Sequence, residues 1–224
     1  MAKSAKVSRK DLLKEPDQFL SGSEKAMLYF VDNKATVIGA VVSIFIGMGS
    51  FFGFNYFKET QTLGNEALYF EMEKVVKNAK GSDPINEVKL IVDKMGGGLQ
   101  KERASLFLAD LHFQNQNFDE ANALFERVKN NSSLGEMNFQ MAQVGLAYNA
   151  ESSKDYPKAI NLFKAVIDAN TDFPLFEVYW SLSRCYELNN DGSNALLILR
   201  EMQIKFASNP NMEKVELRIK KLSV

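Results

Sequence analysis

The chain combines one long uninterrupted apolar run with a series of shorter helical patterns. From Ala35 to Phe57 it carries no charged residue, and a lysine stands at each edge, Lys34 and Lys58. After Thr60, apolar residues recur at helical spacing and no strand-like alternation is sustained. The pattern predicts an all-α protein, with one long apolar helix near the N-terminus followed by a domain of shorter helices.

The apolar run is long enough to cross a membrane. As a helix, its 23 residues would span roughly 34 Å, against about 30 Å of hydrocarbon in a bilayer. A cleaved signal peptide is the alternative, but such peptides have a short basic leader and an apolar core of about 7–15 residues. The leader here has 34 residues, five of them acidic, and no small-x-small cleavage site follows the run. We therefore predict an uncleaved single transmembrane helix.

The charges that flank the run predict its orientation. Residues 1–34 carry seven Lys/Arg, whereas the first twenty residues after the run carry three. By the positive-inside rule, the N-terminus lies in the cytoplasm and the large domain lies on the other side. We expect residues 1–20 to form a polar cytoplasmic tail in contact with membrane lipid, residues 21–57 a juxtamembrane and transmembrane helix, and residues 58–224 the helical domain.

Two local patterns refine the apolar helix. Ser21 followed by Glu24 forms a capping box, so we expect the helix to start near Gly22 and to enter the membrane without a break. Within the run, small residues recur every four positions, and such a stripe lets another helix dock closely in lipid. The stripe consists of Ala35, Gly39, Ser43 and Gly47. Glycine is also common in transmembrane helices without such contacts, which is the alternative interpretation.

The helical domain contains an internal repeat. Residues 106–128, 144–166 and 180–202 share a small residue, an alanine twelve positions later, a large apolar residue after four more and another apolar residue after three more. These positions are Ala109, Ala121, Phe125 and Val128, then Ala147, Ala159, Phe163 and Val166, then Ser183, Ala195, Leu199 and Met202. Small residues let the two helices of a hairpin approach closely, and large ones fill the seam between hairpins. The spacing matches the tetratricopeptide (TPR) pattern, whose period is about 34 residues.

Two flanking parts complete a predicted TPR-like α-solenoid of about four helical hairpins. Before the three repeats lies a degenerate hairpin, with one helix at about 62–79 and another from Ile85 to Met95. The glycines at 96–98 end it; a phosphate-binding loop would need a following Lys-Ser pair and a preceding strand, and the sequence has neither. The segment from Pro210 to Val224 predicts a short C-terminal helix that caps the stack.

Composition argues against several classes of function. The 27 Lys+Arg nearly balance the 28 Asp+Glu, which argues against a nucleic-acid binder. The single cysteine, Cys185, is expected to be a small buried residue, and the single histidine, His112, a packing residue. The sequence has no HExxH, CxxC or nucleophile elbow. We therefore expect no enzyme activity, cofactor, metal or small-molecule substrate.

Binding of other proteins is the favoured function. In hairpin solenoids the first helix of each repeat lines the concave surface. The corresponding positions are Arg103, Leu106, Asp110 and Phe113, then Met141, Val144 and Tyr148, then Glu177, Trp180 and Arg184. Trp180 and Arg184, one helical turn apart, are the strongest pair because Trp and Arg dominate binding hot spots. The alternative is that the short array closes on itself and Trp180 is part of the core.

The order of elements is specific: a charged tail, a capped helix running into one glycine-rich span, degenerate hairpins and a short final helix ending in KKLSV. Over residues 19–224 this order resembles the YfgM-like family of ancillary subunits of the bacterial SecYEG translocon. The resemblance implies a single-pass inner-membrane protein with a periplasmic repeat domain, whose partners are the translocon and periplasmic chaperones. A scaffold for another inner-membrane or envelope complex is the alternative, and composition does not separate the two.

Overall fold

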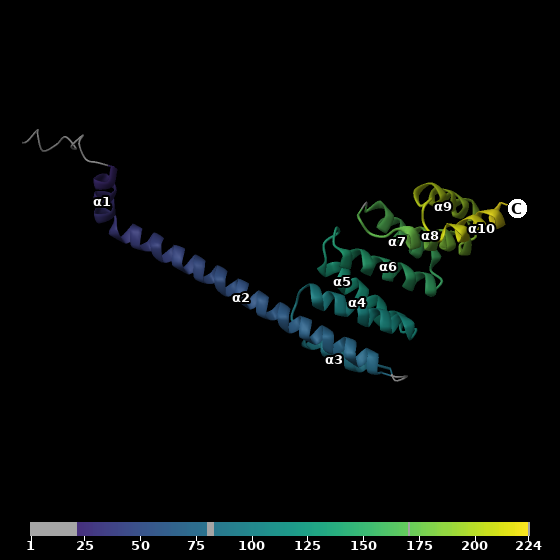
Figure 1. Cartoon of the computed structure of the whole chain (residues 1–224), viewed down its shortest axis with the longest axis horizontal. Coiled ribbons are helices and arrows are strands. Elements are labelled where there is room, and N and C mark those ends of the chain that lie inside the picture. The colour runs from purple at the N-terminus through teal and green to yellow at the C-terminus, as the bar shows by residue number, and fades with distance from the viewer. Residues whose placement is uncertain (1–21, 80–82, 170, 224) are drawn as a thin grey trace, which may run out of the picture. The chain divides into compact units, whose positions relative to one another are not determined.

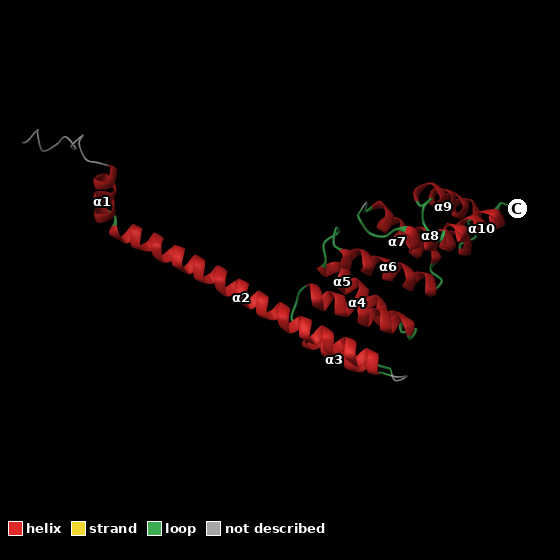
Figure 2. Ribbon diagram, viewed as in Figure 1, coloured by secondary structure: helices red, strands yellow, loops and turns green. Residues whose placement is uncertain are grey.

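A computed structural model describes residues 22–79, 83–169 and 171–223. Over these residues the protein forms ten α-helices and no strand, which confirms the all-α prediction (Figures 1 and 2). The chain divides into two compact units, Met1–Glu59 and Thr60–Val224. Each unit is described by itself below.

The first unit contains α1 (Gly22–Asp32) and the first part of α2 (Lys34–Asn78). The prediction that one helix enters the apolar run without a break is wrong, because α1 ends before Asn33 and the chain turns there (Figure 1). The Asn33 side chain donates to the Tyr29 carbonyl at 3.1 Å, the same oxygen that its backbone N–H bonds. A side chain that competes for the helical hydrogen-bond ladder bends a helix. The predicted cap, Ser21, lies outside the described residues.

The apolar run lies within α2, where no residue from 34 to 60 is buried. Among the described helices, α2 is the one long and apolar enough to cross a membrane, by length and composition. A Cβ atom added at Gly39 or Gly47 would meet nothing within 4 Å. The Ser43 hydroxyl donates to the Gly39 carbonyl at 2.8 Å and is thus satisfied inside the helix. The described part of the chain therefore leaves the small-residue stripe uncovered.

The second unit is a stack of antiparallel helices. After the C-terminal part of α2, the helices are α3 (Ile85–Lys94), α4 (Leu99–Gln114), α5 (Phe118–Asn131), α6 (Met137–Ser152), α7 (Tyr156–Asp168), α8 (Phe176–Leu188), α9 (Gly192–Lys205) and α10 (Met212–Leu222). Helix α4 packs on α5, α6 on α7 and α8 on α9, and each pair packs on the next. These pairs are the three predicted repeats, and α10 is the predicted C-terminal helix packed on α9 (Figure 1).

The repeat positions pack as their spacing predicts. The small residues at the helix crossings are all at most 1% exposed, and they are Ala109, Ala121, Ala147, Ala159, Ser183 and Ala195. The large residues of the seams are also buried: Phe125, Val128, Phe163, Val166, Leu199 and Met202. Burying one such large apolar side chain stabilises the fold by roughly 1.5–3 kcal/mol. Successive hairpins are thus held together mainly by these seams.

Each hairpin turn repeats the same backbone geometry. One non-glycine residue per turn has a left-handed φ of 60–63°, and these residues are Gln116, Lys154 and Asn190. The residue that follows is the N-cap of the second helix. Asp155 and Asp191 each accept a hydrogen bond from the backbone N–H three residues on, at 3.3 and 3.1 Å. Asn117, the equivalent residue in the first turn, makes no such bond.

The glycine triplet at 96–98 ends α3, as predicted, and is fastened to α2. Asn65, which is buried, donates to the Gly96 carbonyl at 3.0 Å and accepts from the Gly96 N–H at 2.9 Å. A Cβ atom at Gly96 would lie 2.7 Å from Cδ of Gln61, so the Gln61 side chain packs directly against this glycine. The first helix of the degenerate hairpin is the C-terminal part of the continuous α2 instead of a separate helix.

Candidate functional site

A groove of about 630 Å³ opens in the second unit and is lined mainly by α4 and α6. Six of the predicted partner-binding residues line it. They are Arg103, Leu106, Asp110, Met141, Val144 and Tyr148. The structure therefore brings the first and second predicted repeats together around one groove.

Helical spacing explains which side chains meet here. Residues 103, 106 and 110 lie on one face of α4, and residues 141, 144 and 148 lie on one face of α6. Between them lies the ring of Phe125 from α5, which is buried and forms the bottom of the groove. A Cβ atom at Gly145 would lie 2.5 Å from Cζ of Phe125. Glycine at this position therefore allows α6 to pass directly over the ring.

One side of the groove carries a cation over an aromatic ring. The guanidinium carbon of Arg103 lies 5.4 Å from the ring centroid of Tyr69, which comes from α2. This is within the range of a cation–π interaction, which holds the arginine side chain along the groove wall. Phe107, half-buried on α4, adds a further apolar surface beside them.

Asp110 and Tyr148 are also held in place. Asp110 accepts a hydrogen bond from Nε2 of Gln114 at 2.6 Å. The ring of Tyr148 packs edge-on against Phe163 with centroids 5.3 Å apart, and its hydroxyl accepts from Ser181 Oγ at 3.1 Å. Tyr148 thus presents a ring of fixed orientation to the groove.

The remaining lining is apolar and adaptable. Leu99, Met137 and Met141 are each about half exposed, at 55%, 53% and 46%. Methionine side chains are flexible and fit apolar partners of many shapes. Among the described residues that line the groove there is no Ser, Thr, Cys, His or Lys. The groove can therefore bury apolar side chains of another polypeptide and pair with its charges through Arg103 and Asp110.

The predicted residues of the third repeat lie elsewhere. Trp180 is half-buried, and Lys214 of α10 lies over its ring at 4.8 Å and pairs with Glu177 at 3.0 Å. Arg184 makes two hydrogen bonds to Glu151 of α6, at 2.5 and 2.7 Å, which raise its pKa. These side chains tie α8 to its neighbours and do not line the groove.

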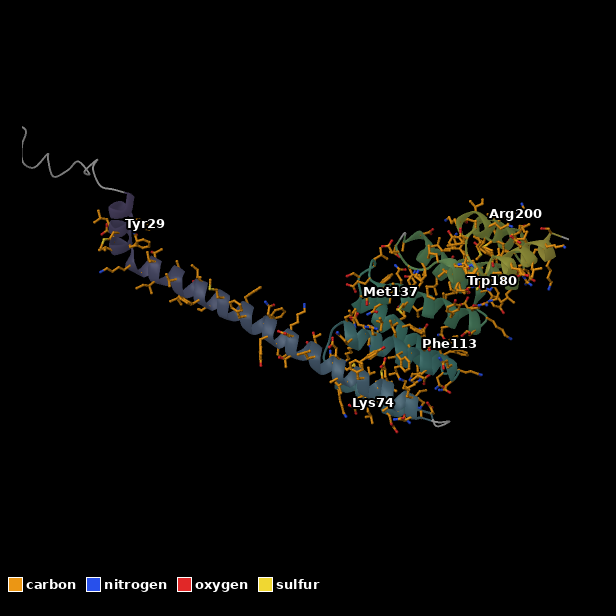
Figure 3. The ribbon with its side chains drawn as sticks, in the orientation of Figure 1. Tyr29, Lys74, Phe113, Met137, Trp180 and Arg200 are labelled. Atoms are coloured by element: carbon orange, nitrogen blue, oxygen red, sulfur yellow. The ribbon has the colours of Figure 1, made fainter. Side chains whose placement is uncertain are left out.

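Phe113, near the C-terminal end of α4 (Figure 3), also does not line the groove, and its ring packs edge-on against Phe118. The prediction did not include the other residues of the lining, which are Tyr69, Leu99, Phe107, Phe125, Met137, Asn138 and Gly145. Helical spacing offered a signal for several of them: Leu99 and Phe107 lie one helical turn before and after Arg103, and Met137 lies one turn before Met141. Tyr69 comes from a different helix, and helical spacing within one repeat could not find it.

The other singled-out residues are packing residues. Cys185 is fully buried, as expected, and burial raises the pKa of its thiol to about 12. His112 is half-buried on α4, and it contributes nothing to the groove lining. In the described part of the chain, no group of three or more His, Cys, Asp or Glu side chains could hold a metal ion.

A model of the tetratricopeptide repeat-like domain matches residues 28–177, about two-thirds of the chain. The chain belongs to this tetratricopeptide repeat-like domain family. Domains of this kind are protein-interaction modules, so the TPR-like architecture supports protein partners in general. The matched range includes the apolar run and every residue of the groove.

Solved structures show the same fold. One is the crystal structure of a candidate kinesin light chain from Podosopora anserina, whose TPR-like repeats are nearly identical to one another. This chain and that structure share 14% sequence identity and a TM-score of 0.58. The match covers 70% of this chain and 84% of that chain, and a single-substitution variant of the same protein matches equally. No curated protein matches the chain. At this sequence identity, the likeness shows that the chain has the TPR-like fold and carries no information about its partners.

Proposed function

We propose that this TPR-like protein is a membrane-anchored binding module of the bacterial inner membrane. In this proposal the apolar run of α2 crosses the bilayer, with the N-terminus in the cytoplasm and the second unit in the periplasm. The module is an ancillary subunit of the SecYEG translocon that passes emerging chains to periplasmic chaperones. The length of the run, the basic N-terminal flank and the resemblance to the YfgM-like family support this proposal.

The observation that carries the proposal is the composition of the groove. A chain that leaves a translocon is unfolded and exposes apolar side chains of many sequences. Phe125, Tyr148 and the two methionines offer such side chains an apolar surface that adapts to shape. Arg103 and Asp110 add one charge of each sign, which suits segments of mixed charge.

The membrane anchor explains why weak binding in this groove would suffice. A tether holds the groove beside the channel, so the groove meets a chain that leaves the channel as if in an intramolecular reaction. For short linkers, the effective concentration of the groove is then in the millimolar range. A groove with modest affinity then captures emerging segments and still releases them to a chaperone.

The proposed module acts by binding and not by catalysis. The ionisable side chains of the groove are Arg103, Asp110 and the two tyrosines, and none stands beside a partner that would make it a nucleophile or a general base. The proposal accordingly includes no cofactor and no small-molecule substrate.

Site-specific photo-crosslinking in native bacterial membranes tests the groove. A benzophenone side chain at Met141 is expected to crosslink to a stalled translocating chain. The matched control is Leu197 on α9, which is 61% exposed and lies outside the groove lining. If crosslinks at Leu197 are as abundant as those at Met141, the groove is not the binding site.

A second pair of positions tests the translocon as neighbour of the apolar run. Ser43 belongs to the small-residue stripe, whereas Phe45 lies about 200° around the helix. A crosslinker at Ser43 should reach a SecYEG subunit, and one at Phe45 should not. Crosslinks from Ser43 to a different membrane complex would favour the alternative role as a scaffold.

A further inference from the structure

Four exposed apolar side chains lie along one edge of the second unit. They are Leu63 of α2, Leu99 at the start of α4, Leu134 in the loop after α5 and Met137 at the start of α6, each 53–61% exposed. We call this set the apolar edge. Leu99, Leu134 and Met137 lie at the loops that connect successive hairpins, and Leu63 lies within α2, two residues before Asn65, which bonds to the first of these loops. The turns within hairpins lie at the other ends of the same helices.

Hydrogen bonds fix the first part of the apolar edge to α2. Asn65 holds the backbone of Gly96 through both polar atoms of its side-chain amide, and Gln61 packs against the same glycine. The loop that precedes Leu99 is therefore fastened to the turn of α2 that carries Leu63.

Further hydrogen bonds fix the second part of the edge to the first. The carboxylate of Glu102, in the first turn of α4, accepts from Ser132 Oγ at 3.0 Å and from Asn138 Nδ2 at 3.4 Å. Nε2 of Gln140 donates to the Leu134 carbonyl at 2.7 Å. The loop that carries Leu134 and the start of α6 are thus hydrogen-bonded to each other and to α4.

The covalent chain limits how far the apolar edge can lie from the apolar run. Leu63, the first residue of the edge, comes six residues after Phe57, the last residue of the run. Six residues reach at most about 22 Å even when fully extended, whatever the orientation of the second unit. If the run crosses a bilayer, the edge therefore begins close to the lipid headgroups.

We propose that the apolar edge rests on the periplasmic surface of the bilayer, with its leucines and methionine among the lipid headgroups. This proposal rests on the membrane anchor of the proposed function. Apolar side chains favour the interface between headgroups and acyl chains, about 5–10 Å deep. Leu99 and Met137 also line the groove, so its mouth would open at the membrane surface, where a translocated chain emerges.

Charge contributes little to this contact. Lys94 and Lys101 lie beside the edge, but Asp93 and Glu102 accompany them, and Lys101 donates to the Met95 carbonyl at 2.8 Å. A contact made by apolar side chains persists at high salt, whereas one made by lysines and anionic lipid weakens.

Fluorescence quenching by lipid tests the proposal on the full chain. The protein is reconstituted alone into vesicles of phosphatidylethanolamine and phosphatidylglycerol that include a headgroup-labelled nitroxide lipid. Leu99→Cys carries an environment-sensitive dye, and Asn115→Cys, at the far end of α4 about 24 Å away, is the matched control. The native Cys185 is fully buried and remains unlabelled. We expect quenching at Leu99 to exceed that at Asn115 by at least about twofold, and to persist in about 0.5 M salt.

A third label, at Ile44→Cys in the apolar run, separates failure of this inference from failure of the anchor. Quenching at Ile44 by an acyl-chain nitroxide without quenching at Leu99 overturns the apolar edge and leaves the anchor intact. If Ile44 is not quenched, the anchor fails and the edge proposal fails with it. Quenching at Leu99 that is lost at high salt assigns the contact to charge and contradicts the proposal.

Discussion

Substitution of Gly145 by alanine tests the construction of the groove most directly. The added methyl would lie 2.5 Å from Cζ and 2.7 Å from Cδ1 of Phe125, whose ring is 6% exposed and packed among Ala121, Ala142 and Leu146. The ring can relieve this overlap only by moving into the groove or by straining the seam between repeats. Overpacking of this kind costs about 1–3 kcal/mol.

An alanine in a helix interior also contributes a favourable term of about 1 kcal/mol relative to glycine. Gly64→Ala isolates that term, because Gly64 lies within α2 and a Cβ there would meet nothing within 4 Å. We therefore expect the unfolding free energy to rise in Gly64→Ala, and to be lower in Gly145→Ala than in Gly64→Ala by about 1–3 kcal/mol.

Urea unfolding of the full chain in detergent micelles, followed by circular dichroism, measures this difference. Phe125→Leu in the Gly145→Ala background should recover part of the loss, because the smaller side chain vacates the space that the methyl needs. Equal stabilisation by the two alanine substitutions would refute the close passage of α6 over the Phe125 ring.

Three further predictions concern the second unit. Lys154→Asn should stabilise it by about 0.5 kcal/mol in the same urea assay. Lys154 has a left-handed φ, and asparagine, which occupies the equivalent turn position at Asn190, tolerates this conformation better than lysine. An unchanged urea midpoint would contradict this. Asp155→Ala should cost about 1 kcal/mol and Asn117→Ala less, since only the aspartate caps its helix; equal losses would show that the cap bond is unimportant. The raised pKa of Cys185 stabilises the folded state fully below pH 9.0, and this contribution is lost as the pH rises toward about 12. Cys185→Ala should therefore lose less stability between about pH 9 and about pH 11 than the native chain, and parallel pH profiles would show that the buried thiol does not contribute.

The repeats were readable from the sequence because their packing depends on a few short-range spacings. A small residue and an alanine twelve positions apart meet at a helix crossing whatever lies around them, so the spacing of Ala109 and Ala121 is enough to mark a hairpin. The same periodicity placed Arg103 and Met141 on faces that meet in the groove.

Other features depend on contacts between distant parts of the chain, and spacing carries no information about those. Trp180 occupies the same register as Val144, which lines the groove, but Lys214 of the C-terminal helix lies over its ring. At the break, the Asn33 side chain bonds to the Tyr29 carbonyl in a stretch whose composition is otherwise helical, so helical spacing did not mark it. The sequence changes from apolar to polar residues after Phe57, and α2 continues through this change without a break in secondary structure.

Tyr148 has two roles, and this limits how the protein could diversify. Its ring faces the groove, while its hydroxyl and its contact with Phe163 join the second repeat to the third. A lineage that altered Tyr148 to recognise a new ligand would loosen the joint between repeats at the same time. Met141 lines the groove and belongs to neither the joint between repeats nor the apolar edge, so changes in binding preference should accumulate at this position first.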